Sequence, residues 1–210
     1  MAYTTEGIRN LALVGHAGSG KTTLAESLLL DAGVINEVGV VEKGSTVTDF
    51  DELEQKHHHS LTAALASYDY GDTHINLIDT PGYPDFIGPT LSVLGAVETI
   101  AIVVNAQNGV ESSTRRMMEA VKQRNLCAMI VVNRIDAEDV DLEAVYAQIQ
   151  ESFGSECLAV NLPTSNGSDV VDCFFGTEGE SDISSVEDAH TAIVDQTVEL
   201  DDDLMTAYLD

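Results

Sequence analysis

Gly15-His16-Ala17-Gly18-Ser19-Gly20-Lys21-Thr22 is the stretch that decides the fold of this chain. It follows the apolar run 11–14, which predicts a buried strand, and it precedes the run 23–30, which predicts a helix. A strand, a glycine-rich turn, a Lys-Thr pair and a helix in this order are typical of a phosphate-binding P-loop. Backbone N–H groups and the positive end of the helix dipole would face one anion, Lys21 would reach the β- and γ-phosphates, and the Thr22 hydroxyl would bind Mg²⁺. We therefore expect the phosphates to be bound by residues His16, Ala17, Gly18, Ser19, Gly20, Lys21, Thr22 and Thr23.

Asp79-Thr80-Pro81-Gly82 is the second motif that carries chemistry. It follows the apolar run 75–78, which predicts another buried strand. A carboxylate that ends a strand beside a P-loop can hold Mg²⁺, usually through water, so Asp79 is a candidate metal ligand together with Thr22. The Pro-Gly turn frees the chain, and the Gly82 N–H could then meet a γ-phosphate. Alone, these four residues would more often be a plain turn, and it is the preceding P-loop that favours a function.

Asn133-Arg134-Ile135-Asp136 is the third motif, and it follows the apolar run 128–132. The Asp136 carboxylate can accept hydrogen bonds from N1–H and N2–H₂ of guanine, a pair of donors that adenine lacks. Asn133 can brace the P-loop and the purine edge, and the stem of Arg134 can cover the ring. These residues predict GTP and GDP as ligands. By itself the motif could equally be a loop with a helix N-cap.

Strand and helix patterns alternate along the rest of the chain. Apolar residues predict a strand at 99–104, and length and periodicity predict helices at 112–124 and 141–153. The segments 61–70 and 74–79, joined by Gly71-Asp72-Thr73, read as a hairpin. The sequence therefore predicts an α/β fold of the P-loop NTPase type, with a mainly parallel sheet, helices on both faces and one antiparallel strand.

The three motifs in this order resemble the translational GTPases, and within them elongation factor G and its elongation factor G-like relatives. Residues 79–86 resemble the family's Asp-Thr-Pro-Gly-His-x-Asp-Phe, and residues 105–111 resemble the turn after its next strand. Residues 161–164, 170–172 and 204–209 resemble parts of the insert peculiar to elongation factor G. The resemblance spans nearly the whole chain and implies the amino-terminal GTPase domain of a longer protein that acts with the ribosome. It implies a GTP-binding core at 1–160 and the start of the insert at 161–210, with the chain ending before the last core strand and helix.

The segment 33–60 matches the first switch loop by position. In the family this loop ends in Arg-Gly-Ile-Thr, whose threonine binds Mg²⁺ with GTP, and Ser60 occupies the equivalent place. The three histidines 57–59 precede it, but consecutive residues of an extended chain point to alternate faces, so we interpret them as a solvated loop and not as a metal site.

Two further positions depart from the family. The histidine that positions the attacking water is replaced by Tyr83. The resemblance therefore implies Lys21, Gly82 and Tyr83 as catalytic residues, with slow hydrolysis in the absence of a partner. The family's last base-binding motif, a Ser-Ala pair after a late strand, is absent, and we interpret Thr164-Ser165 as part of the insert. A regulatory GTP-binding module with little or no hydrolysis is the alternative, which Tyr83 favours, and an ATP-dependent P-loop enzyme is a third hypothesis.

The composition restricts the partners. With 9 basic and 36 acidic residues, the formal net charge of −27 argues against nucleic-acid binding by this domain itself. The charge suits either a merely soluble acidic surface or a high-salt cytoplasm. No apolar run reaches the roughly 18 residues of a membrane span, and the N-terminus lacks a signal peptide. The three isolated cysteines fit reduced thiols, so we expect a cytoplasmic protein. We also expect a monomer that does not bind membranes.

Overall fold

The computed structural model describes residues 3–49, 51–57, 59–200 and 202–209. The chain divides into two compact units, Met1–Asn133 and Arg134–Asp210. The first unit is a mixed α/β fold around a five-stranded, mostly parallel sheet, which confirms the predicted fold class. The division after Asn133 reflects the compactness of the two units and does not test the boundary that the sequence predicts at residue 160. That boundary stays a prediction.

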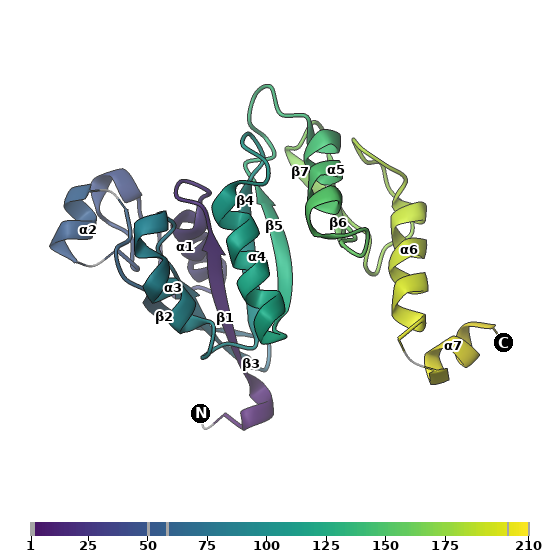
Figure 1. Cartoon of the computed structure of the whole chain (residues 1–210), viewed down its shortest axis with the longest axis horizontal. Coiled ribbons are helices and arrows are strands. Elements are labelled where there is room, and N and C mark those ends of the chain that lie inside the picture. The colour runs from purple at the N-terminus through teal and green to yellow at the C-terminus, as the bar shows by residue number, and fades with distance from the viewer. Residues whose placement is uncertain (1–2, 50, 58, 201, 210) are drawn as a thin grey trace. The chain divides into compact units, whose positions relative to one another are not determined.

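The sheet of the first unit has the strand order β2-β3-β1-β4-β5 (Figure 1). Four strands run parallel: β1 (Ile8–Gly15), β3 (Thr73–Asp79), β4 (Thr99–Asn105) and β5 (Cys127–Asn133). The edge strand β2 (Ala64–Tyr70) pairs antiparallel with β3, as the hairpin predicts. The carboxyl ends of β1, β3 and β5 therefore carry the P-loop, Asp79 and Asn133 at one edge of the sheet.

The apolar strands form the core of the first unit. In β4 every residue from Ile100 to Asn105 is buried, as expected of a parallel strand covered on both faces. Leu13 and Leu77 of the neighbouring strands pack with Ala25 and Leu29 of the first helix in one buried cluster. This packing fixes the base of the P-loop against the strand that ends in Asp79.

Helices cover both faces of the sheet. Figure 1 shows α1 (Lys21–Asp31) and α4 (Ser112–Arg124) on either side of β1, which both helices contact. The bounds of α4 are those that the sequence predicts. The remaining helical elements of this unit are short: η1 (Thr5–Gly7), η2 (Val41–Lys43), α2 (Glu52–His57), η3 (Pro84–Phe86) and α3 (Ile87–Val93).

The described residues of the second unit form three helices and a hairpin. Its elements are α5 (Leu142–Phe153), β6 (Asn161–Thr164), β7 (Asp169–Asp172), α6 (Val186–Val198) and α7 (Asp202–Leu209). Asp141 caps α5 by accepting from the Ala144 N–H at 2.9 Å, and Leu162, Cys173 and Val186 form a small buried cluster. Among the helices of the described residues, none has the length and apolar character that crossing a membrane requires.

Candidate functional site

Lys21 lies at the centre of the P-loop and is only 6% exposed. Its Nζ donates to the carbonyl oxygens of Gly15 at 3.2 Å and His16 at 2.9 Å. Burial lowers the Lys21 pKa to about 8, although the charges of Asp79 and Glu111 oppose this shift. The lysine is therefore still largely an ammonium at pH 7.

Gly82 approaches the P-loop closely. A Cβ added at this position would lie 2.5 Å from Lys21 Nζ and 2.6 Å from the backbone nitrogen of Ala17. Any larger residue would therefore displace the lysine or the loop. The predicted partners Lys21 and Gly82 are thus brought together, and both lie beside the P-loop backbone that is expected to hold phosphate.

Asn133, at the end of β5, is joined directly to the P-loop. Its Nδ2 donates to the Ser19 carbonyl at 2.9 Å. A Cβ on Gly20 would collide with the same Nδ2, and Gly20 has φ +92°, so both the space and the backbone require glycine there. The bracing of the P-loop that the sequence suggests for Asn133 is present in the structure.

The other predicted phosphate-binding residues differ in exposure. Gly18 and Thr23 are exposed, and an added Cβ on Gly18 would meet no atom within 4 Å. Ser19 is buried, and its Oγ has no hydrogen-bond partner among the described residues. His16 reaches away from the loop, with Nδ1 2.8 Å from Ser113 Oγ and Nε2 3.5 Å from Glu111 Oε1.

Thr22 and Asp79 meet beside the lysine. The Thr22 hydroxyl donates to Asp79 Oδ2 at 2.7 Å. Burial raises the Asp79 pKa to about 6, against the lowering effects of hydrogen bonds from Thr22 and Thr48 and of the Lys21 charge. The second carboxylate oxygen, Oδ1, is buried and has no partner among the described residues. A hard cation is the kind of group that such an oxygen and a neighbouring hydroxyl suit, so Thr22 and Asp79 fit Mg²⁺.

Two buried glutamates hold the backbone of the predicted first switch, residues 33–60, and of the residues that follow it. Glu26 of α1 accepts from the Gly39 N–H at 2.8 Å and the Val47 N–H at 2.6 Å. Glu54 of α2 accepts from the backbone N–H groups of Leu61 at 2.9 Å and Thr62 at 3.0 Å. Sequence reasoning missed both residues, although an acidic residue within the apolar run 24–30 was a usable signal.

Two hydroxyls of this segment have different partners. Ser60, the predicted metal ligand, donates to Asp49 Oδ1 at 2.7 Å. Thr48, which the sequence analysis did not single out, donates to Asp79 Oδ2 at 3.1 Å. Thr48 is 4% exposed and Asp49 is 2% exposed, so both are buried.

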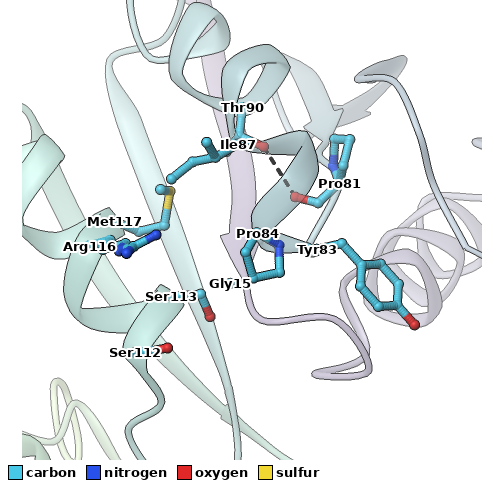
Figure 2. Close-up of a pocket in the computed structure, with 11 residues that line it drawn as sticks. Gly15, Pro81, Tyr83, Pro84, Ile87, Thr90, Ser112, Ser113, Arg116 and Met117 are labelled. Atoms are coloured by element: carbon cyan, nitrogen blue, oxygen red, sulfur yellow. Dashed lines mark hydrogen bonds between the residues drawn. The ribbon is translucent and has the colours of Figure 1, made fainter.

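Tyr83 lies directly after Gly82, at the N-cap of η3. Figure 2 shows its phenol pointing away from Ile87, Arg116 and Met117, with which it lines a small pocket. Tyr83 is 45% exposed, and the His59 ring packs edge-on against the Tyr83 ring with the centroids 4.7 Å apart. His59 is therefore a half-buried contact of Tyr83 and not simply part of a solvated loop; His58 and the side chain of His57 lie outside the described residues.

Arg134 and Asp136 of the base-recognition motif are exposed and belong to the second unit. Arg134 has φ +60°, which places a sharp turn directly after Asn133. The backbone of Gly167 packs on this turn, since an added Cβ would collide with the Ile135 carbonyl. Gly167 lies between β6 and β7, in the connection that also contains Ser165, the second residue of the Thr164-Ser165 pair.

Comparison with known proteins identifies one family. The model of the elongation factor Tu GTP-binding domain matches residues 6–202. An elongation factor G-like protein of Mycobacterium tuberculosis is 34% identical over 97% of this chain and 30% of its own length. The tetracycline resistance protein TetM of Ureaplasma urealyticum is 34% identical over 71% of this chain and 23% of its own length.

A solved structure from Thermus thermophilus has the same fold. It superimposes with a TM-score of 0.86 at 31% identity and covers 96% of this chain. The chain matches 33% of that protein, and it spans about a third or less of each of these relatives.

Proposed function

We propose that this chain, which belongs to the elongation factor Tu GTP-binding domain family of translational GTPases, binds and hydrolyses GTP. It would do so as part of an elongation factor G-like factor that acts on the ribosome. One observation carries the proposal. Lys21, Thr22, Asp79 and Gly82 converge at the carboxyl edge of the sheet, and Asn133 holds the same loop in place. This is the arrangement that phosphoryl transfer needs, because such catalysis depends on positioning and electrostatics.

The P-loop and Gly82 would bind the phosphates in this proposal. Backbone N–H groups of the P-loop at the start of α1 would face the anion, helped by the positive end of the α1 dipole. Lys21 supplies a full positive charge against the β- and γ-phosphates. Gly82 offers its N–H next to Lys21 Nζ, where no larger residue fits.

Thr22 and Asp79 would hold Mg²⁺ in this proposal. When bound, the ion neutralises charge that develops on the β- and γ-phosphate oxygens. Asp79 lies at the end of β3 and Thr22 in the first turn of α1, and both elements pack in the same buried core. The Thr22 and Asp79 oxygens that would bind Mg²⁺ are therefore carried by two elements that pack firmly against each other.

The base would be recognised by Asn133, Arg134 and Asp136. Asp136 accepts from the two guanine donors, and the Arg134 stem covers the ring. Tyr83 would orient the attacking water. Unlike an imidazole, a phenol offers no readily exchanged second nitrogen, so we propose slow hydrolysis that a partner accelerates, with the ribosome as that partner.

The remaining proposals concern the context of the domain. Residues 1–160 are proposed as the GTP-binding core and 161–210 as the start of the family insert. The net charge of −27 supports binding to the ribosome through other parts of a longer protein and not through this acidic domain. A cytoplasmic location and a monomeric state go with this proposal.

Nucleotide selectivity tests the proposed function. Labelled GTP and ATP are titrated into wild type, Asp136→Asn and the nearby exposed control Asp139→Asn. We expect GTP to be preferred, and Asp136→Asn to bind GTP about 10- to 100-fold more weakly, since hydrogen bonds to a charged group contribute about 1.5–3 kcal/mol. Xanthosine triphosphate should gain affinity for this variant, because its O2 accepts from the new amide. Equal affinities of wild type for GTP and ATP would remove the guanine assignment.

A further inference from the structure

The oxygen cluster around Asp79 contains a hydroxyl from the first switch. Thr48 Oγ1 donates to Asp79 Oδ2 at 3.1 Å, and the same oxygen accepts from Thr22 Oγ1 at 2.7 Å. Two hydroxyls from distant parts of the chain therefore meet at one buried carboxylate. Ser60 is one contact further away, because its hydroxyl is engaged by Asp49 Oδ1 at 2.7 Å.

The position of Thr48 is fixed by the helix that also carries Thr22. The buried carboxylate of Glu26, on α1, accepts from the N–H of Val47 at 2.6 Å, directly before Thr48. Its other oxygen holds Gly39 at 2.8 Å, so both oxygens of Glu26 are used for the switch backbone. Directly after Thr48, Asp49 accepts from the Thr46 hydroxyl at 3.2 Å. Thr48 is thus held from both sides in the chain.

The same cluster contains an independent sign of a ligand. Asp79 is 1% exposed, and its Oδ1 has no hydrogen-bond partner among the described residues. Burying a carboxylate oxygen without a donor or a cation is costly, and the buried carboxylate of Asp49 adds negative charge nearby. Hydroxyl and carboxylate oxygens are the protein ligands that a hard divalent cation prefers.

We propose that Thr48, and not Ser60, is the residue of the first switch whose hydroxyl completes the cation site of Thr22 and Asp79. The ion is the Mg²⁺ that accompanies a guanine nucleotide, so the inference rests on the proposed function. Ser60 acts one step away as a positioning residue, because it holds Asp49 beside Thr48. In this proposal the first switch contacts the cation through Thr48, which precedes α2. The sequence analysis instead predicted this contact for Ser60, which follows α2.

The Mg²⁺ dependence of GTP-analogue binding tests this inference. A fluorescent, non-hydrolysable GTP analogue is titrated into the whole chain in EDTA and at a series of Mg²⁺ concentrations, for wild type, Thr48→Val, Thr48→Ser and Ser60→Ala. Thr191→Val, an exposed residue of α6, is the matched control. We expect Thr48→Val to raise the half-saturating Mg²⁺ concentration at least about tenfold, with the affinity in EDTA retained. Thr48→Ser should stay close to wild type, and Ser60→Ala, which acts only through Asp49, should raise the half-saturating Mg²⁺ concentration less than Thr48→Val does.

Three results would overturn the inference while leaving the proposed function in place. The first is a Mg²⁺ dependence of Thr48→Val equal to that of wild type. The second is a larger increase in the half-saturating Mg²⁺ concentration for Ser60→Ala than for Thr48→Val. The third is a nucleotide affinity of Thr48→Val that falls equally with and without Mg²⁺. The last result would mean that Thr48 only supports the switch backbone. Failure of wild type to bind the GTP analogue would instead overturn the proposed function and this inference together.

Discussion

Tyr83 is the residue at which the sequence predicts a departure from the catalytic chemistry of the family. It directly follows Gly82, which lies against Lys21 Nζ, so the start of its side chain is close to the expected γ-phosphate. Its ring rests edge-on against His59 of the first switch. Tyr83 therefore has two separable properties, a hydroxyl that can hydrogen-bond water and a ring that contacts His59 of the segment 33–60.

Two substitutions of Tyr83 separate these properties. Tyr83→Phe keeps the ring contact and removes the hydroxyl, so we expect ribosome-stimulated hydrolysis to slow about fivefold, the value of one hydrogen bond of about 1 kcal/mol. Tyr83→Ala also removes the contact with His59 and should slow it further. Single-turnover GTP hydrolysis by the full-length protein, with and without ribosomes, provides the measurement. Fast turnover of wild type without ribosomes, or a Tyr83→Phe rate equal to wild type on ribosomes, would contradict a water-orienting hydroxyl.

The sequence could indicate those site residues whose geometry is set locally. Lys21 and Gly82 belong to short motifs in which adjacent strands and turns fix the backbone, so their proximity follows from the motifs and the sheet order. Thr48 and Glu26 could not be assigned in this way, because their partners lie 31 and 21 residues away. The contact of His59 with Tyr83 likewise depends on how the switch folds back, which no local pattern encodes.

At the scale of elements, buried strands and long helices were predictable and short ones were not. The run 99–104 predicts β4 because burial on both faces leaves a continuous apolar stretch. In contrast, β1 begins at Ile8, before the apolar run, since Arg9 and Asn10 pair with β3 and the Asn10 side chain accepts from Asn76 at 2.8 Å. The six-residue α2 is too short to show helical periodicity, and the buried Glu54 ties it to the chain that follows.

Helix α1 holds the backbone of the predicted first switch through the Glu26 side chain. A substitution of Glu26 therefore tests whether this helix stabilises the segment. Glu26→Gln replaces one accepting oxygen by an N–H₂ group, so one of the two switch N–H groups loses its acceptor. We expect a loss of about 1–3 kcal/mol in the free energy of unfolding, and faster proteolysis within residues 33–60. Denaturant unfolding and limited proteolysis measure the two effects.

The control for Glu26 is Glu151→Gln, an exposed residue of the helix α5, for which we expect a change within about 0.5 kcal/mol. Equal unfolding free energies of Glu26→Gln and wild type would show that Glu26 does not hold the switch. A loss of stability with unchanged cleavage within residues 33–60 would place the effect in the core around α1.

At the scale of the whole molecule, charge is the dominant property. The chain has 36 acidic and 9 basic residues, and several carboxylates are used inside the first unit, where Glu26, Glu54, Asp49 and Asp79 are buried. The buried carboxylates have specific donors, whereas most of the remaining acidic residues add to a surface of one sign. Self-repulsion of such a surface destabilises the compact state and is screened by salt.

Salt should therefore stabilise this chain. We expect Tm to rise between 0.05 and 1 M NaCl, because the screening length falls from more than about 10 Å to about 3 Å. Each gain of about 1 kcal/mol corresponds to a rise of about 2–4 °C for a chain of this size. The control compares NaCl with Na₂SO₄ at equal ionic strength below about 0.3 M, where screening predicts the same Tm and exclusion of sulfate from the surface would separate the two salts. A Tm that falls as NaCl rises would show that attraction between specific charges outweighs the repulsion of the net charge of −27.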